Sequence, residues 1–263
     1  MSVLVASFRF LALAVVILVG TLLVLLAALV PVDVKGARPA AWVTKAMARS
    51  FFVVFGLRLT CSDPEAFRRH RGFLFPNHES YVDVIAVMAL GPVRFLAMKE
   101  VKRWPFIGWI AMAIGTVFVD RSNPASRDAA RARVSRQIAK RPHPPIALFP
   151  EGKIGQGNEL LPFRFGAFEM AVEGGVAYRP CVIHYDRYDL IEWDKEPVWV
   201  SAWRLARYVR RHEARVVLLD EVMPESSDDP ERLARDAHAV IDAAFLGLGG
   251  ASGLPADEER RTR

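Results

Sequence analysis

The chain opens with an unbroken hydrophobic segment. No charged residue occurs from Phe10 to Val32, and nearly every position there is apolar. A helix of this length can cross a hydrocarbon core of roughly 30 Å, so the pattern predicts a retained membrane helix. The alternative is a cleaved signal peptide. Its apolar region would normally be shorter, about 7–15 residues, with a small-residue cleavage site behind it.

A second apolar segment follows from Pro39 to Leu57, interrupted by Lys45 and Arg49. These two cations are four positions apart and share one face of a helix, which favours an amphipathic helix in the membrane interface. We expect residues 1–56 to hold both membrane-associated helices. More basic residues follow the first segment than precede it, so the positive-inside rule places the rest of the chain in the cytoplasm.

Beyond this point, short apolar runs alternate with segments of helical spacing. Strands separated by helices predict an α/β domain over residues 57–250, with a mostly parallel sheet covered on both faces. The charged tail, 251–263, is predicted to be disordered. The predicted strands are 57–61, 72–75, 93–97, 116–119, 145–149, 176–184 and 214–219. The predicted helices are 81–90, 101–114, 124–140, 166–173, 199–211 and 229–246.

Composition narrows the class of partner. Of 263 residues, 52% are hydrophobic, and the formal net charge is +6. A basic, membrane-proximal protein favours anionic lipid surfaces and anionic substrates. Nucleic acid is disfavoured as a partner because the basic residues are scattered along the sequence. The two cysteines, Cys61 and Cys181, lie in apolar surroundings and are expected to be reduced and packed.

The block Asn77–Asp83 directly follows an apolar run, residues 73–76. His78 is a candidate general base, and Asp83 a carboxylate that could orient it. The two side chains meet only if His78 lies in the turn before a helix and Asp83 in its first turn. The same placement lets Ser80 and Asp83 form a capping box, so a purely structural role is the alternative.

Other chemistries fit this block less well. A metal site could use His78, Glu79 and Asp83, but no second histidine follows at helical spacing. Ser80 lacks the Gly-x-Ser-x-Gly context of a strained nucleophile. The glycine-rich segment 152–157 lacks the Gly-Lys-Ser/Thr ending of a nucleotide-binding phosphate loop, and we exclude that function.

Glu151 and Gly152 follow another apolar run, residues 145–149, where a strand is predicted to end. In open α/β sheets, ligands bind beyond the carboxyl ends of the strands. Several cations lie near such ends and could hold an anionic group, the arginines by paired hydrogen bonds. They are Lys99, Arg121, Lys153 and Arg164.

Four blocks in order, between about Leu57 and Val222, resemble the glycerolipid acyltransferases typified by 1-acylglycerol-3-phosphate O-acyltransferase. In that family the third block often continues with Thr and Arg, whereas this chain has Lys153 and Ile154. This departure leaves the acceptor headgroup open. The matching blocks are Asn77–Asp83, Gly115–Arg121, Phe149–Gly152 and Arg179–Val182.

The resemblance implies an α/β fold and acyl transfer without a covalent acyl-enzyme. His78 would take the proton of an acceptor hydroxyl, and Asp83 would hold and stabilise the imidazole. Glu151 would organise a cationic pocket for the headgroup, and amides near Gly152 would steady the oxyanion. The pocket would consist of Arg121 with Lys99, Lys153 or Arg164.

The resemblance further implies membrane lipids as partners, with acyl-CoA or acyl carrier protein as the donor substrate and no cofactor or metal. Lysophosphatidate, converted to phosphatidate, is the first acceptor to expect. Another lyso-lipid, such as a lyso-aminolipid or a glycolipid, is the alternative. A non-catalytic membrane scaffold is the hypothesis from another functional class.

Overall fold

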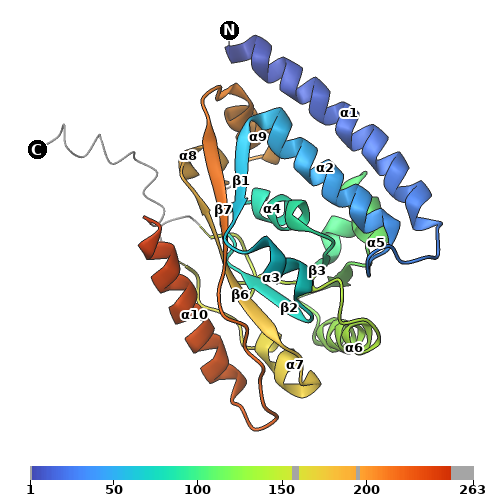
Figure 1. Cartoon of the computed structure of the whole chain (residues 1–263), viewed down its shortest axis with the longest axis vertical. Coiled ribbons are helices and arrows are strands. Elements are labelled where there is room, and N and C mark those ends of the chain that lie inside the picture. Colours follow the sequence, from blue (N-terminus) through green and yellow to red (C-terminus); the bar gives the residue numbers. More distant parts are fainter. Residues whose placement is uncertain (1, 156–159, 194–195, 250–263) are drawn as a thin grey trace, which may run out of the picture.

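The computed structural model describes residues 2–155, 160–193 and 196–249 (Figure 1). The predicted tail, 251–263, falls outside these residues. The limits predicted for the N-terminal segment and the α/β domain remain predictions.

The strands form one sheet in the order β1-β7-β6-β2-β5-β3-β4. From β6 to β4 all neighbours are parallel, whereas β7 is antiparallel to β6 and parallel to β1. The predicted mostly parallel sheet is therefore confirmed. The strands are β1 Leu57–Cys61, β2 Phe73–Pro76, β3 Arg94–Met98, β4 Val117–Val119, β5 Ile146–Ala147, β6 Tyr178–Tyr185 and β7 His212–Leu218.

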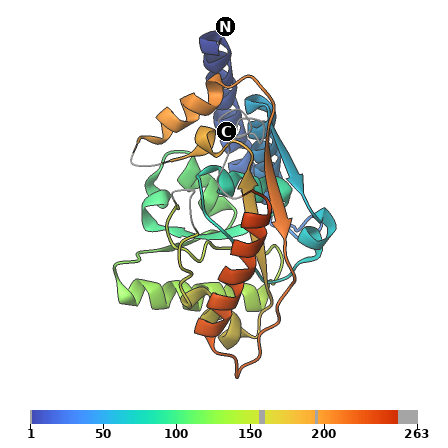
Figure 2. The same cartoon turned by 90° about the vertical axis from the view of Figure 1, so that its left-hand side faces the viewer.

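Helices cover both faces of the sheet (Figures 1 and 2). Strand residues alternate between two cores, as the period of two requires: Leu74 packs into one, and Phe73 and Phe75 into the other. The first core is closed by α2 Pro39–Phe55, α4 Val82–Leu90 and α9 Val198–Arg207. The second is closed by α6 Pro124–Lys140, α7 Gly166–Gly174 and α10 Pro230–Gly247.

The structure departs from the predicted elements in several places. The helix predicted over 101–114 is wrong: the chain forms a 3-10 turn, η1 Lys99–Arg103, and then α5 Ile107–Ala113. Pro105 interrupts the helical hydrogen bonds, and Phe106 takes a positive φ of 62°. Strand β5 is shorter than predicted. Two short helices were not predicted, because neither is long enough to show a period: α3 Pro64–Arg69 and α8 Tyr188–Ile191.

The first helix, α1 Ser2–Ala28, lies along the domain (Figure 1). It packs on α2 and also contacts α9 and α5. Among the described residues, it is the one helix long and apolar enough to cross a membrane, judged by length and composition. In contrast, α2 buries Phe51, Phe52 and Phe55 in the first core. One face of α2 is therefore part of the domain core.

Candidate active site

The parallel strands bring the sequence-predicted residues to one edge of the sheet. His78 follows the end of β2, Lys99 directly follows β3, and Arg121 follows β4. Glu151 follows β5 by a few residues, and Tyr185 ends β6. Since these five strands all run in the same direction, their carboxyl ends form one continuous edge.

His78 and Asp83 meet as the sequence predicted. The Nδ1 atom of His78 lies 2.9 Å from Asp83 Oδ2. Because the carboxylate accepts, Nδ1 carries the proton, and Nε2 is the nitrogen available to a substrate. The imidazole stacks on Phe149, with ring centroids 3.9 Å apart and planes 19° apart. The contact is possible because Asp83 lies in the first turn of α4 and His78 in the turn before it.

The Asp83 carboxylate is fully buried and receives several hydrogen bonds. Its Oδ2 also accepts from the backbone amides of Glu79 at 2.7 Å and Ser80 at 2.8 Å. Its Oδ1 accepts from the Tyr185 hydroxyl at 2.6 Å. A buried carboxylate requires such donors. Sequence reasoning missed Tyr185, although a polar residue that ends a buried apolar strand is a usable signal.

The Ser80 hydroxyl has a different role from the predicted helix cap. It donates to the Ile191 carbonyl at 2.8 Å, which ties the block to α8. Its contact with the Val82 amide is longer, 3.3 Å. The Asp83 carboxylate does accept from the Ser80 amide, which is half of a capping box. The structural and catalytic roles of Asp83 are therefore compatible in one geometry.

Glu151 is buried and contacts backbone amides rather than cations. Its Oε1 accepts from the His78 amide at 2.7 Å, and its Oε2 from the Leu161 amide at 3.1 Å. Burial raises its pKa to about 8, and the negative charge of Glu79 adds to the rise. These contacts hold the backbone of His78, and the expected role of Glu151 in organising the cations remains a prediction.

This raised pKa gives a measurable pH dependence of stability. A carboxyl whose pKa rises from 4.5 to about 8 on folding contributes stability below pH 4.5 that is lost as pH rises towards 8. The slope is at most about 1.4 kcal/mol per pH unit. In Glu151→Gln, we expect the thermal unfolding midpoint to change less with pH between pH 5 and 8 than it does in the wild type. The exposed control Glu173→Gln should keep the wild-type slope; an equal slope in both variants would contradict the assignment.

Three of the four predicted cations gather beside the Phe149–Gly155 turn. Burial lowers the pKa of Arg121, and the positive charge of Arg164 lowers it further, so these two guanidinium groups are close. A Cβ atom built on Gly152 would lie 2.8 Å from Arg164 Nε, which places Arg164 against the turn, with Lys153 next in the chain. Among the described residues, no carboxylate forms an ion pair with Arg121 or Arg164. Lys99 differs, because it pairs with Asp120.

The turn itself fixes the backbone near the histidine. Gly152 has φ +76° and donates its amide hydrogen to the Phe149 carbonyl at 3.0 Å. The Gly152 amide is therefore engaged, so the amides near Gly152 that were expected to steady an oxyanion would have to be those of its neighbours in the turn. The Gly155 amide donates to the His78 carbonyl at 2.7 Å. Both ends of the turn thus contact His78, one through Phe149 and one through Gly155.

The sequence analysis considered a metal site at His78, Glu79 and Asp83 as an alternative. Among the described residues, no group of three or more His, Cys, Asp and Glu side chains is arranged to hold a metal ion.

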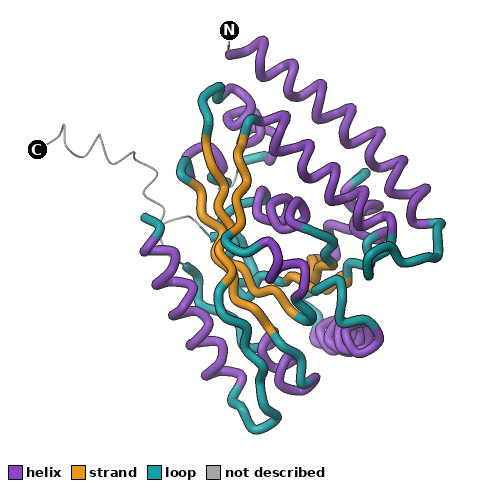
Figure 3. Tube along the Cα trace, in the orientation of Figure 1, coloured by secondary structure: helices purple, strands orange, loops and turns teal. Residues whose placement is uncertain are grey.

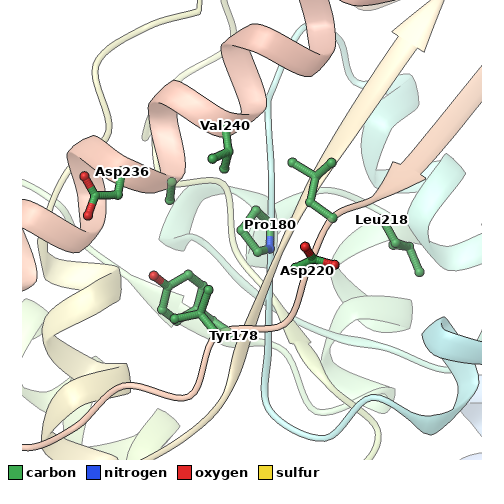
Figure 4. A pocket seen from close by; sticks show the side chains of 9 residues that line it. Tyr178, Pro180, Leu218, Asp220, Asp236 and Val240 are labelled. Carbon is green, nitrogen blue, oxygen red and sulfur yellow. The ribbon is translucent and has the colours of Figure 1, made fainter.

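A pocket of about 370 Å³ lies under α10, where Tyr178, Asp220 and Asp236 contribute to its lining (Figure 4). None of the predicted site residues lines it, so it is separate from the edge that carries His78.

The chain is similar in sequence to several acyltransferases. The family model described as Acyltransferase matches residues 58–184. A lyso-ornithine lipid O-acyltransferase of Pseudomonas aeruginosa is 31% identical, over 65% of this chain and 66% of that protein. The Rhodobacter capsulatus protein of the same name is 29% identical, over 90% and 88%. A 1-acyl-sn-glycerol-3-phosphate acyltransferase of Haemophilus influenzae is 28% identical, over 65% and 79%.

The fold has a solved counterpart. The 1-acyl-sn-glycerophosphate acyltransferase of Thermotoga maritima superposes with a TM-score of 0.73, covering 94% of this chain and 96% of that one at 18% identity. The matched family region runs from β1 to β6 and includes His78, Asp83, Arg121 and Glu151. On the sequence match and the shared fold, this chain belongs to the acyltransferase family that includes the 1-acyl-sn-glycerol-3-phosphate and lyso-ornithine lipid acyltransferases.

Proposed function

We propose that this protein transfers an acyl chain from an acyl thioester to the free hydroxyl of a lyso-lipid, with lysophosphatidate as the first candidate acceptor. The observation that carries the proposal is the 2.9 Å contact between His78 and Asp83 at a sheet edge that also holds Arg121 and Arg164, two cations without an ion-pair partner among the described residues. The relatives named above, whose names describe acyl transfer to lyso-lipids, support it.

The geometry supports a direct transfer. His78 Nε2 takes the proton of the acceptor hydroxyl as its oxygen forms a bond to the thioester carbonyl carbon. The carbon–sulfur bond breaks, and the imidazolium returns the proton to the departing thiolate. Asp83 stabilises the imidazolium through the contact with Nδ1. The thioester, from acyl-CoA or acyl carrier protein, is a substrate, and the steps require no cofactor.

The cations beside the turn suit an anionic headgroup. The guanidinium groups of Arg121 and Arg164 can each hold a phosphate with two hydrogen bonds, and Lys153 adds a point charge. In the proposed complex, the backbone amides of Lys153 and Ile154 take over the oxyanion role that the Gly152 amide cannot fill.

Arg121 offers a direct test of headgroup binding. Arg121→Lys keeps the charge but loses the forked pair of hydrogen bonds. We expect the apparent KM for the lyso-lipid to rise about 10-fold, corresponding to the loss of one charge-assisted hydrogen bond, with kcat little changed. Steady-state kinetics with each substrate varied in turn measures this. A rise confined to the KM of the thioester would instead assign Arg121 to the donor.

A lyso-ornithine lipid is the second candidate acceptor. A relative named for that activity aligns with 90% of this chain, and Lys153 with Ile154 departs from the usual third block. The deciding experiment supplies the purified full-length protein with lysophosphatidate or lyso-ornithine lipid, and with acyl-CoA or acyl carrier protein, and follows thiol release. Turnover with neither acceptor would contradict the proposed function and favour a scaffold.

We further propose that the protein lies on the cytoplasmic surface of the membrane, anchored by α1. The outer side of α1 exposes Leu4, Phe8 and Leu11, each at least 66% accessible. Because α1 also packs on α2, α5 and α9, it lies along the domain, which supports embedding in one leaflet rather than a free span.

Removing residues 1–37 tests this anchor. We expect the shortened protein to stay in solution when vesicles float, because the exposed apolar side of α1 is lost. It should act on detergent-dispersed acceptor better than on vesicles. Solubility must be checked first, since α2 loses its partner helix. Flotation and vesicle activity equal to those of the full chain would show that α1 is not the anchor.

A further inference from the structure

A groove with three cations lies beside α2, apart from the catalytic residues. It has a volume of about 390 Å³ and runs between α2, β1, α3 and the end of α4. Lys45, Arg49 and Arg68 line it, and no Asp or Glu is among the described residues of its lining. The groove reaches Ala89 at the end of α4, whereas Asp83 lies in the first turn. At a rise of 1.5 Å per residue, Ala89 and Asp83 are about 9 Å apart along the helix axis.

The positive charge in the groove is only partly compensated. Burial lowers the pKa of Lys45, and the charges of Arg49 and Arg68 lower it further, so the three cations are near enough to repel one another. Arg49 donates to the Ala89 carbonyl at 3.0 Å, and Arg68 pairs with Glu65 on its own helix. A bound anion would relieve this repulsion.

The rest of the lining is apolar. Phe52 is buried and Leu59 half-buried, whereas Val53, on the rim, is 81% exposed. Val53 shares a helix face with Lys45 and Arg49, at spacings of eight and four residues respectively. An inorganic anion gains nothing from such a wall, but the glycerol and acyl chains of a phospholipid do. Charge and apolar surface together match an amphipathic anion.

The groove is also placed where such lipids occur. The neighbouring helix α1 packs on α2 through Met47, on the side away from Lys45, and presents its own apolar side outwards. If α1 is embedded in the bilayer, the cations of α2 lie at the level of the headgroups. We propose that this groove binds one anionic phospholipid of the bilayer surface, in addition to the lipid that reacts at His78.

A native thiol reports on the groove directly. Cys61 lines it and is half-buried, whereas Cys181 is buried, so N-ethylmaleimide should label Cys61. The full-length protein in a non-ionic detergent is labelled with increasing dihexanoyl phosphatidylglycerol, and the Cys61 peptide is followed by mass spectrometry. We expect the lipid to slow labelling. Lys45→Gln with Arg68→Gln should raise the half-protecting concentration about 25-fold, at about fivefold per cation.

The control variant Arg133→Gln with Arg136→Gln removes the same charge from exposed positions on α6 and should behave like the wild type. Equal protection by dihexanoyl phosphatidylcholine or by inorganic phosphate would overturn the proposal. Wild-type protection of the Lys45→Gln, Arg68→Gln variant would also overturn it. His78→Ala should keep the protection. Labelling does not require turnover. If the lipid protects Cys61 in a protein that fails to transfer acyl chains, the proposed function is contradicted and the proposed lipid site is not.

Discussion

His78→Ala is expected to lower acyl transfer by at least about 10²–10⁴-fold, the usual contribution of general acid–base catalysis. The fold should survive the change. The backbone of residue 78 keeps its contacts with Glu151 and Gly155, which do not involve the imidazole. The side chain is already 15% exposed, and its main packing partner is Phe149. The loss should therefore fall on kcat.

Initial rates with saturating lyso-lipid and thioester measure this effect, together with a thermal unfolding curve of the same sample. His238→Ala is the matched control, since His238 lies on α10 and is half-buried. It should retain wild-type turnover. Near-normal turnover of a folded His78→Ala protein would exclude His78 as the base, and the scaffold hypothesis would then gain support.

Asp83→Asn is expected to cost on the order of 10²-fold or more in kcat, for a reason that the hydrogen bonds make specific. Asp83 Oδ2 accepts from His78 and two backbone amides, so the asparagine oxygen should take that place. Its amide group can then face the Tyr185 hydroxyl, which can turn to accept. The geometry and the imidazole tautomer survive, and the stabilising negative charge is lost.

Tyr185→Phe tests the positioning of the Asp83 carboxylate separately from its negative charge. It removes one donor to Asp83 but keeps the carboxylate and the aromatic packing. We expect a smaller fall in kcat than for Asp83→Asn, about 10-fold, because one hydrogen bond to a charged group contributes roughly 1.5–3 kcal/mol. The KM of the lyso-lipid should not change. A Tyr185→Phe enzyme as inactive as Asp83→Asn would mean that the hydroxyl has a further role.

The local sequence predicted the parts of the site that depend on neighbours along the chain. Apolar runs with turn residues at their ends identified the strands, although several limits shifted. The spacing of His78 and Asp83 across a turn and a first helical turn predicted their contact, which the structure has at 2.9 Å. The sequence also contains the signal for the break at Pro105, because proline disrupts the interior of a helix. The apolar pattern across 101–114 nevertheless led to the prediction of one continuous helix.

Contacts between distant segments were decided only by the tertiary structure. Tyr185 lies 102 residues after Asp83, and Glu151 lies 73 residues after His78; neither partner can be inferred from spacing. The shift of the Glu151 pKa likewise depends on burial by segments far apart in sequence. Helix α2 has the composition of an interfacial helix, yet packing against α4 makes one of its faces core. Sequence periodicity determines which side of an element is apolar, whereas the partner that covers it depends on how the whole chain closes.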